Sequence, residues 1–146
     1  MIVVDASVAL KWVLQEQGSD RAIALLADEM LGAPDLFWVE CANVLWVKAR
    51  RGQIDRADAN AALAAIDAAP VSAIPARSLV TAAQTIAFEL DQTVYDCLYL
   101  AAALAQGAVF VTADEAFAKA ALAHPVYGLD QRAAKAARVE AERRSR

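Results

Sequence analysis

The 146-residue chain is predicted to fold as one α/β domain, in which helices flank both faces of a central parallel sheet of four to five strands. Short runs of β-branched residues alternate with longer helical patterns, and this alternation is typical of a parallel sheet covered by helices. Hydrophobic residues make up 59% of the chain, which favours a compact domain over disorder. The length is enough for one domain with its own core.

The first half of the chain is expected to begin with a central strand, because residues 1–4 form an apolar run. A long helix at 35–51 stops at Gly52. Asp55 can cap the next helix, with Asp58 three residues later. For this half we expect strands at 1–4 and 30–34, and helices at 7–16, 20–27, 35–51 and 55–68.

The second half continues the alternation after a strand at 71–74, which Pro75 ends. The stretch 95–106 predicts a buried helix, because Asp96 is its only charged residue. For this half we expect strands at 71–74, 108–112 and, at an edge of the sheet, 126–127, and helices at 78–90, 95–106 and 114–123.

The net charge of −4 is unevenly placed along the chain. Residues 1–130, the expected domain, hold eight Lys/Arg and sixteen Asp/Glu, whereas the basic Ala/Arg-rich tail at 131–146 holds six Lys/Arg and two Glu. We expect this tail to be a frayed helix or disordered. An acidic body does not favour general nucleic-acid binding, because phosphate contacts supply most of that affinity. If the chain does contact a nucleic-acid backbone, the best candidates for the phosphate contacts are Lys11, Lys48, Arg50 and Arg51.

The N-terminus has no basic segment before its apolar run, so we expect no signal peptide. No apolar run is long enough to cross a membrane, and a cytoplasmic protein without membrane contacts is expected. Cys41 and Cys97 lie inside apolar helical patterns and are expected to be buried. A zinc site and histidine-based catalysis are disfavoured, because there is no CxxC motif and His124 is the single histidine.

Four carboxylates stand at the edges of elements that are otherwise apolar, although charged residues are seldom buried without a partner or a metal ion. Three of them have simple structural alternatives. Asp5 can cap the helix that follows it, and Asp96 can belong to a capping box that starts at Thr93. Thr112 to Glu115 also fits a capping box, so Asp114 is expected in the first turn of the last helix, where it would complement the helix dipole.

Glu40 is the fourth carboxylate and the hardest to explain as a structural residue. Between Asp35 and Lys48 the only other polar side chain is Asn43, which lies on the same helix face. A solvated face would carry more polar residues than these. The alternative is a polar seam that touches water between two helices.

The four carboxylates can meet at one edge of the sheet if the strands before Asp5 and Asp114 are neighbours. The helices that carry the other two can reach the same edge. Carboxylates this close raise each other's pKa values, and Mg²⁺ or Mn²⁺ would remove that penalty, because hard cations prefer oxygen ligands. Ser7, Asn43 and Thr112 are candidates for second-layer residues that orient the carboxylates.

An ordered set of short motifs gives the chain a resemblance to a known family. The motifs are Val3-Val4-Asp5-Ala6-Ser7, then Glu40-x-x-Asn43, then Tyr95-Asp96-Cys97-Leu98-Tyr99-Leu100-Ala101, and last Val111-Thr112-Ala113-Asp114. In this order they resemble the PIN domain, and most closely the VapC toxins of bacterial type II toxin–antitoxin modules. The resemblance covers about residues 1–130; each motif is weak alone, and their order makes the set specific.

The resemblance implies a single PIN-like domain that acts as a metal-dependent endoribonuclease. Asp5, Glu40, Asp96 and Asp114 would then be the catalytic residues and would hold one or two Mg²⁺ or Mn²⁺ ions. The metal would activate a water molecule that hydrolyses an RNA phosphodiester bond. The number of ions, the RNA target and the identity of any antitoxin stay open at this point.

The resemblance also implies a homodimer and a cognate VapB-type antitoxin. That partner would lay a helix into an apolar groove and could present a basic residue to the carboxylates. Trp38 or Trp46 would suit such a groove if exposed, although core packing is the expected role of both.

Two other functions are compatible with an acidic cluster on an α/β domain. A receiver-like signalling domain would need paired acids after the first strand and a lysine after a late strand, whereas Asp5 is single and Asp114 follows the late strand. A catalytically silent PIN-like module would work only by binding partners. The presence of all four acidic residues argues against this second alternative.

Overall fold

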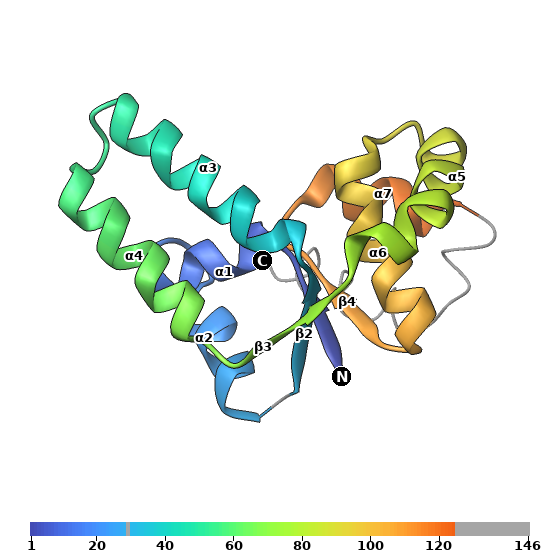
Figure 1. The fold of residues 1–146 in the computed structure, drawn as a ribbon, viewed down its shortest axis with the longest axis horizontal. Coiled ribbons are helices and arrows are strands. Elements are labelled where there is room, and N and C mark those ends of the chain that lie inside the picture. The colour runs from blue at the N-terminus through green and yellow to red at the C-terminus, as the bar shows by residue number, and fades with distance from the viewer. Residues whose placement is uncertain (29, 125–146) are drawn as a thin grey trace.

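The computed structural model describes residues 1–28 and 30–124. Within these residues the centre of the molecule is a sheet of four parallel strands in the order β3-β2-β1-β4 (Figure 1). The strands are β1 (Ile2–Val4), β2 (Leu31–Pro34), β3 (Val71–Ile74) and β4 (Val109–Val111). The predicted α/β class with a parallel central sheet is therefore confirmed.

β1 lies between β2 and β4, with Val3 opposite Gly32 on one side and Phe110 on the other. Val3 and Val4 are fully buried, as expected for a central parallel strand that is covered on both faces. Because all of these strands run in the same direction, their carboxyl ends lie at one side of the sheet. We call this side, where residues 5 and 112 follow β1 and β4, the carboxyl edge.

Four helices from the first half of the chain lie on one side of the sheet (Figure 1). They are α1 (Ala6–Val13), α2 (Ser19–Asp28), α3 (Leu36–Arg50) and α4 (Arg56–Ala68). α3 and α4 form an antiparallel pair that extends away from the sheet, and we call this pair the α3–α4 arm.

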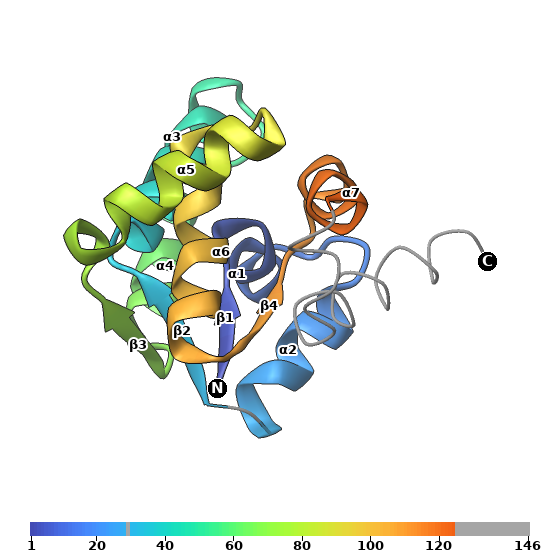
Figure 2. The same cartoon turned by 90° about the vertical axis from the view of Figure 1, so that its right-hand side faces the viewer.

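The other side of the sheet is covered by segments from the second half of the chain (Figure 2). They are the 3-10 turn η1 (Ala76–Leu79), α5 (Val80–Leu90) and α6 (Val94–Gln106), while α7 (Glu115–Ala123) follows β4. Helices on both faces of the sheet agree with the predicted architecture.

Several predicted elements have shifted ends. The helix predicted at 7–16 is shorter, because Leu14 adopts an extended backbone after Val13. The helix predicted at 78–90 begins as the 3-10 turn η1 before it becomes α5. Asp55 caps α4 as predicted, with its Oδ1 accepting a hydrogen bond from the Asp58 N–H at 2.7 Å.

Two predictions for the C-terminal part lie outside the described residues. These are the edge strand at 126–127 and the basic tail at 131–146. The domain boundary at residue 130 therefore stays a prediction.

α6 is buried over most of its length, as predicted, with Tyr99 only 1% exposed. Cys97 in α6 and Cys41 in α3 are both fully buried, which confirms the expectation for the two cysteines. Within the described ranges, none of the helices has both the length and the apolar character needed to cross a membrane.

Candidate active site

Two of the four carboxylates stand at neighbouring strand ends, and we call Asp5 and Asp114 the strand-edge pair. Asp5 directly follows β1, and Asp114 lies three residues beyond the end of β4, which pairs with β1. Each caps the helix that follows it. Asp5 Oδ1 accepts from the Val8 N–H at 3.3 Å, and Asp114 Oδ1 accepts from the Phe117 N–H at 3.0 Å.

Two hydroxyl groups hold the Asp5 carboxylate and join the two loops at the carboxyl edge. The Ser7 hydroxyl donates to Asp5 Oδ1 at 2.5 Å and accepts from the Ala113 N–H at 2.9 Å. The Thr112 hydroxyl donates to Asp5 Oδ2 and accepts from the Asp114 N–H at 3.0 Å. Both carboxylate oxygens of Asp5 are therefore oriented by hydroxyls that are themselves fixed by the backbone.

The start of α7 differs from the prediction. Asp114 is the N-cap of this helix rather than a residue of its first turn. The predicted capping box of Thr112 and Glu115 is wrong, because the Thr112 hydroxyl is used by the Asp5 carboxylate and the Asp114 N–H.

Glu40 and Asp96 come from helices, and we call them the helix pair. Glu40 lies in the second turn of α3, and its Oε2 accepts a hydrogen bond from the Tyr99 hydroxyl at 2.6 Å. Asp96 lies in the first turn of α6, where Thr93 is the N-cap as expected. The Thr93 hydroxyl accepts from the Asp96 N–H at 3.2 Å, and a hydrogen bond between the Thr93 side chain and the Asp96 carboxylate lowers the pKa of that carboxyl against the effect of burial.

The electrostatics show that the four carboxylates act on one another. Burial, and to a smaller degree the charge of Asp114, raise the pKa of Asp5 to about 6 against the opposing effect of its hydrogen bonds. Burial also raises the pKa of Asp96, with Asp114 again adding to the rise. The pKa of Glu40 is raised by burial and then by the charge of Asp96. The charge of Asp114 in the strand-edge pair thus affects the pKa of Asp96 in the helix pair.

The chemistry of these side chains fits a hard divalent cation. In the described part of the chain none of the four carboxylates forms an ion pair; the only ion pairs found there, at Glu16, involve other residues. No three His, Cys, Asp or Glu side chains within residues 1–28 and 30–124 already form a compact group around one point. Mg²⁺ usually keeps several water ligands and takes one or two carboxylates, so it does not need such a group.

The basic and polar residues predicted to belong to the site differ in their exposure and in their contacts. Lys11 does not fit the expected RNA contact: it is 7% exposed, its Nζ donates to a backbone carbonyl at 2.5 Å, and Glu16 lies 3.9 Å away. Lys48 Nζ is 3.7 Å from the same Glu16 carboxylate, whereas Arg50 and Arg51 are exposed at the end of α3. Asn43 is exposed, and no hydrogen bond joins its side chain to the four carboxylates in the described residues.

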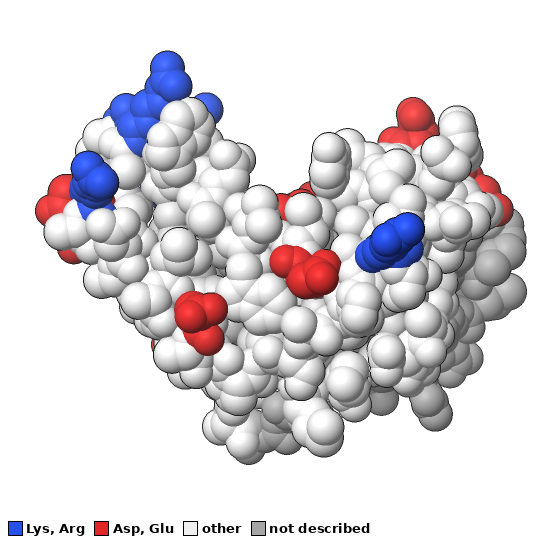
Figure 3. All heavy atoms as spheres, in the orientation of Figure 1, with Lys and Arg blue, Asp and Glu red and all other residues white. Residues whose placement is uncertain are grey.

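A cleft lies between the α3–α4 arm and the part of the molecule formed by α5 and α6 (Figure 3). Acidic atoms are visible inside the cleft, and basic atoms gather at the tip of the arm. Because Arg50 and Arg51 lie at that end of α3, cations stand at the rim of an acidic cleft.

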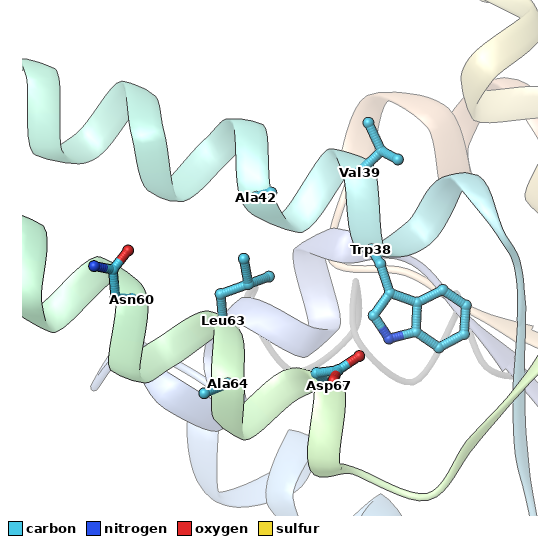
Figure 4. Close-up of a pocket in the computed structure, with 7 residues that line it drawn as sticks. All are labelled: Trp38, Val39, Ala42, Asn60, Leu63, Ala64 and Asp67. Carbon is cyan, nitrogen blue, oxygen red and sulfur yellow. The ribbon is translucent and has the colours of Figure 1, made fainter.

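A separate groove of about 600 Å³ runs between the two helices of the α3–α4 arm (Figure 4). Leu63 of α4 points towards α3, and Trp38 is only half-buried. Trp46 is 55% exposed, so the expected core role is wrong for this residue. The groove is lined by Trp38, Val39, Ala42, Asn60, Leu63, Ala64 and Asp67.

Tyr99 is a site residue that the sequence reasoning missed. Its contact with Glu40 joins residues that lie 59 positions apart in the chain. The available signal was its place three residues after Asp96 in a buried helix, because a buried tyrosine hydroxyl usually needs a hydrogen-bond partner.

Comparison with known proteins agrees with this fold. PAE2754 from Pyrobaculum aerophilum has a similar structure, with a TM-score of 0.64 and 26% identity over 82% of this chain and 83% of that one. VapC20 of Mycobacterium tuberculosis, a sarcin-ricin loop cleaving toxin, gives a TM-score of 0.58 and 18% identity over 73% of this chain and 84% of that one. The second likeness shows a shared fold alone. The search of curated proteins gave no match.

The family model of the PIN domain matches residues 2–122, which is most of the chain. This match removes the receiver-like alternative, because it assigns the same elements to a different fold family. Members of the matched family are generally nucleases. The chain, with its parallel sheet flanked by helices, belongs to the PIN domain family.

Proposed function

We propose that the protein is a metal-dependent endoribonuclease and the toxin of a type II toxin–antitoxin module. The observation that supports this proposal is the charge coupling that links Asp5 with Asp114, Asp114 with Asp96 and Asp96 with Glu40, with no cationic partner for these carboxylates in residues 1–28 and 30–124. Such a cluster costs stability unless a cation offsets the repulsion. Membership of the PIN family supports nuclease chemistry for this site.

The strand-edge pair and the helix pair would together hold Mg²⁺ or Mn²⁺. When bound, such an ion lowers the pKa of a coordinated water and offsets charge on the scissile phosphate. The chain itself orients the carboxylates, because the Ser7 and Thr112 hydroxyls keep the Asp5 carboxylate in one position. Arg50 and Arg51 at the rim would attract the RNA backbone towards the cleft.

The direct test is cleavage of a structured RNA by the purified protein with Mg²⁺, with Mn²⁺ or with EDTA. We expect cleavage with either metal and none with EDTA. Asp96→Asn should lose the activity, whereas the exposed Asp20→Asn in α2 should keep it. Cleavage that survives both EDTA and Asp96→Asn would contradict the proposal. Metal binding without cleavage of any RNA tested would instead favour a catalytically silent PIN module.

We further propose that the groove in the α3–α4 arm receives a helix of a VapB-type antitoxin and that the toxin is a homodimer. The apolar residues Val39 and Leu63 in the groove support an amphipathic partner. Glu40 follows Val39 in α3 but faces Tyr99 of α6, because adjacent helix positions point in different directions, so a bound helix would reach the helix pair only by extending beyond the groove. It could there present a basic side chain to the carboxylates.

Co-expression with the product of the gene immediately upstream tests this partner. The two proteins are expected to co-purify as an inactive complex. Leu63→Asp should prevent co-purification, while Leu104→Asp on the exposed side of α6 should not. A complex that forms equally well with Leu63→Asp would reject the groove. Light scattering of the toxin alone measures whether it is a dimer.

A further inference from the structure

In the described part of the chain, the Glu40 side chain accepts a hydrogen bond from the Tyr99 hydroxyl at 2.6 Å. Tyr99 is 1% exposed, and a buried hydroxyl without a partner would cost free energy. Glu40 is a flexible side chain that would otherwise sample several rotamers. The contact therefore restricts Glu40 through its Oε2 and leaves Oε1 for another ligand.

The Tyr99 ring is held by two further aromatic rings. It stacks on Phe110 of β4 with a centroid distance of 6.3 Å and an interplanar angle of 16°. Phe110 meets Phe117 of α7 edge to face at 5.9 Å and 84°. We call Tyr99, Phe110 and Phe117 the aromatic column. All of its members are at least 95% buried, so the Tyr99 ring has little room to move.

The aromatic column also reaches the strand-edge pair. The backbone N–H of Phe117 donates to Asp114 Oδ1 at 3.0 Å. The same packed unit therefore touches Glu40 at one end and Asp114 at the other. This connection spans both pairs of carboxylates without passing through a charged residue.

We propose that Tyr99 is a positioning residue of the acidic site, whose hydroxyl, held by the aromatic column, fixes the Glu40 carboxylate relative to Asp114. The inference rests on the proposed function and adds a residue that acts through Glu40 rather than on substrate. Removing a hydrogen-bond partner of a metal ligand typically costs about 10–100-fold in metal affinity or activity. The loss of one hydroxyl at Tyr99 should therefore weaken divalent-cation binding.

Tyr99→Phe removes this hydroxyl and keeps the ring. Tyr95→Phe is the matched control, because Tyr95 lies on the same helix and is 63% exposed. Mn²⁺ affinity, measured by titration calorimetry at one pH, is expected to fall about 10-fold in Tyr99→Phe and to stay unchanged in Tyr95→Phe. The kcat for RNA cleavage should fall with it, while the KM for RNA stays the same.

A double-mutant cycle separates positioning from a general effect on the fold. In a Glu40→Ala background, Tyr99→Phe should cause no further loss of Mn²⁺ affinity, because the residue through which it acts is gone. An equal loss in both backgrounds would overturn the proposal. So would an unchanged Mn²⁺ affinity in Tyr99→Phe, whether or not its melting temperature falls.

The readouts also distinguish this proposal from the nuclease proposal. A wild-type protein that binds Mn²⁺ but cleaves no RNA would sink the nuclease function, while the affinities still decide the role of Tyr99. If Tyr99→Phe does not fold, Phe110→Leu loosens the aromatic column from the other side. It is expected to lower Mn²⁺ affinity by a smaller factor, and an unchanged affinity there would overturn the proposal.

Discussion

The strand-edge pair and the helix pair hold their carboxylates by different means. Asp5 accepts hydrogen bonds from Ser7, Val8 and Thr112, which all lie in loops or helix starts at the carboxyl edge. Glu40 accepts a hydrogen bond from the Tyr99 hydroxyl, and Tyr99 belongs to α6 on the other face of the sheet. The first pair is thus fixed by the ends of two adjacent strands. The second is fixed only once the helices on both faces have packed.

This difference decides how firmly each carboxylate is held before a cation binds. A carboxylate with both oxygens bonded to hydroxyls has little freedom before a cation binds. A carboxylate with one such bond is held through one oxygen and keeps the other for a ligand. We therefore expect Asp5 to define where the cation binds and Glu40, fixed through Oε2 by Tyr99, to offer its Oε1.

The largest effect is expected from breaking the strand-edge pair. Asp5→Asn removes the carboxylate that stands at the end of the central strand, and RNA cleavage should fall at least about 100-fold, since metal-assisted catalysis contributes several kcal/mol. The fold should remain, as measured by far-UV circular dichroism. Asp20→Asn serves as the control. Retention of a third or more of the activity in Asp5→Asn would show that the strand-edge pair does not define the site.

The second effect is a pH dependence of stability in the metal-free protein. The pKa of Asp5 is raised from its ordinary 3.8 to about 6, so between these values the folded state binds more protons than the unfolded state. This contribution to stability is present in full below the lower value and is lost as the pH rises through about 6. It is worth at most roughly 3 kcal/mol, and the raised pKa values of Glu40 and Asp96 act in the same direction.

Urea denaturation in EDTA at several pH values between about 5 and 7 measures this effect. The free energy of unfolding should rise as the pH falls in the wild type, and the rise should be smaller in Asp5→Asn. Saturating Mn²⁺ should flatten the profile, because a bound cation keeps the carboxylates ionised. A profile that is identical in Asp5→Asn would assign the titration to other groups.

The third effect concerns the hydroxyls that orient the strand-edge pair. Thr112→Val keeps the shape of the side chain but leaves the Asp114 N–H without its acceptor and Asp5 with one donor fewer. The unfolding free energy should fall by about 1–3 kcal/mol, the cost of unsatisfied buried groups. Thr81→Val on the exposed side of α5 is the control. Equal changes in the two variants would mean that the Thr112 hydroxyl does not hold the loops together.

Short-range features of this molecule could be predicted from the sequence. The strand before Asp5, the cap at Asp55 and the start of α6 at Thr93 all depend on residues within a few positions of one another. The parallel sheet followed from the alternation of strands and helices. The grouping of Asp5 with Asp114 then followed from strand adjacency, because parallel strands end at the same edge.

The remaining features depend on long-range packing, which periodicity does not encode. The loop after α1 covers Lys11. The ammonium group of Lys11 donates a hydrogen bond to the backbone of this loop and forms an ion pair with Glu16. Trp46 looks like a core residue by type, yet the arm that carries it extends away from the sheet and leaves it 55% exposed. Tyr99 donates its hydrogen bond to Glu40, which lies 59 positions away in the sequence. In each case the deciding neighbour is distant in sequence or set by the direction of a loop.

The smallest effect is expected at the start of α6, where Thr93 caps the helix that carries Asp96. Thr93→Ala should cost about 1 kcal/mol, less than Thr112→Val, because Thr93 is exposed and water can replace its hydroxyl. Fraying of the first turn would also loosen Asp96, whereas Tyr99 one turn later stays within the aromatic column. Mn²⁺ affinity should therefore fall slightly, as measured by calorimetry.

Asp55→Ala is the matched control for this last change, because it removes an exposed cap of similar strength from α4, within the α3–α4 arm. Its cost in unfolding free energy should be about the same, with no change in Mn²⁺ affinity. If both variants weaken Mn²⁺ binding equally, the affinity follows overall stability and the first turn of α6 has no special role. If only Thr93→Ala does, the helix pair depends on a cap that contributes little to the fold but fixes one of its two carboxylates.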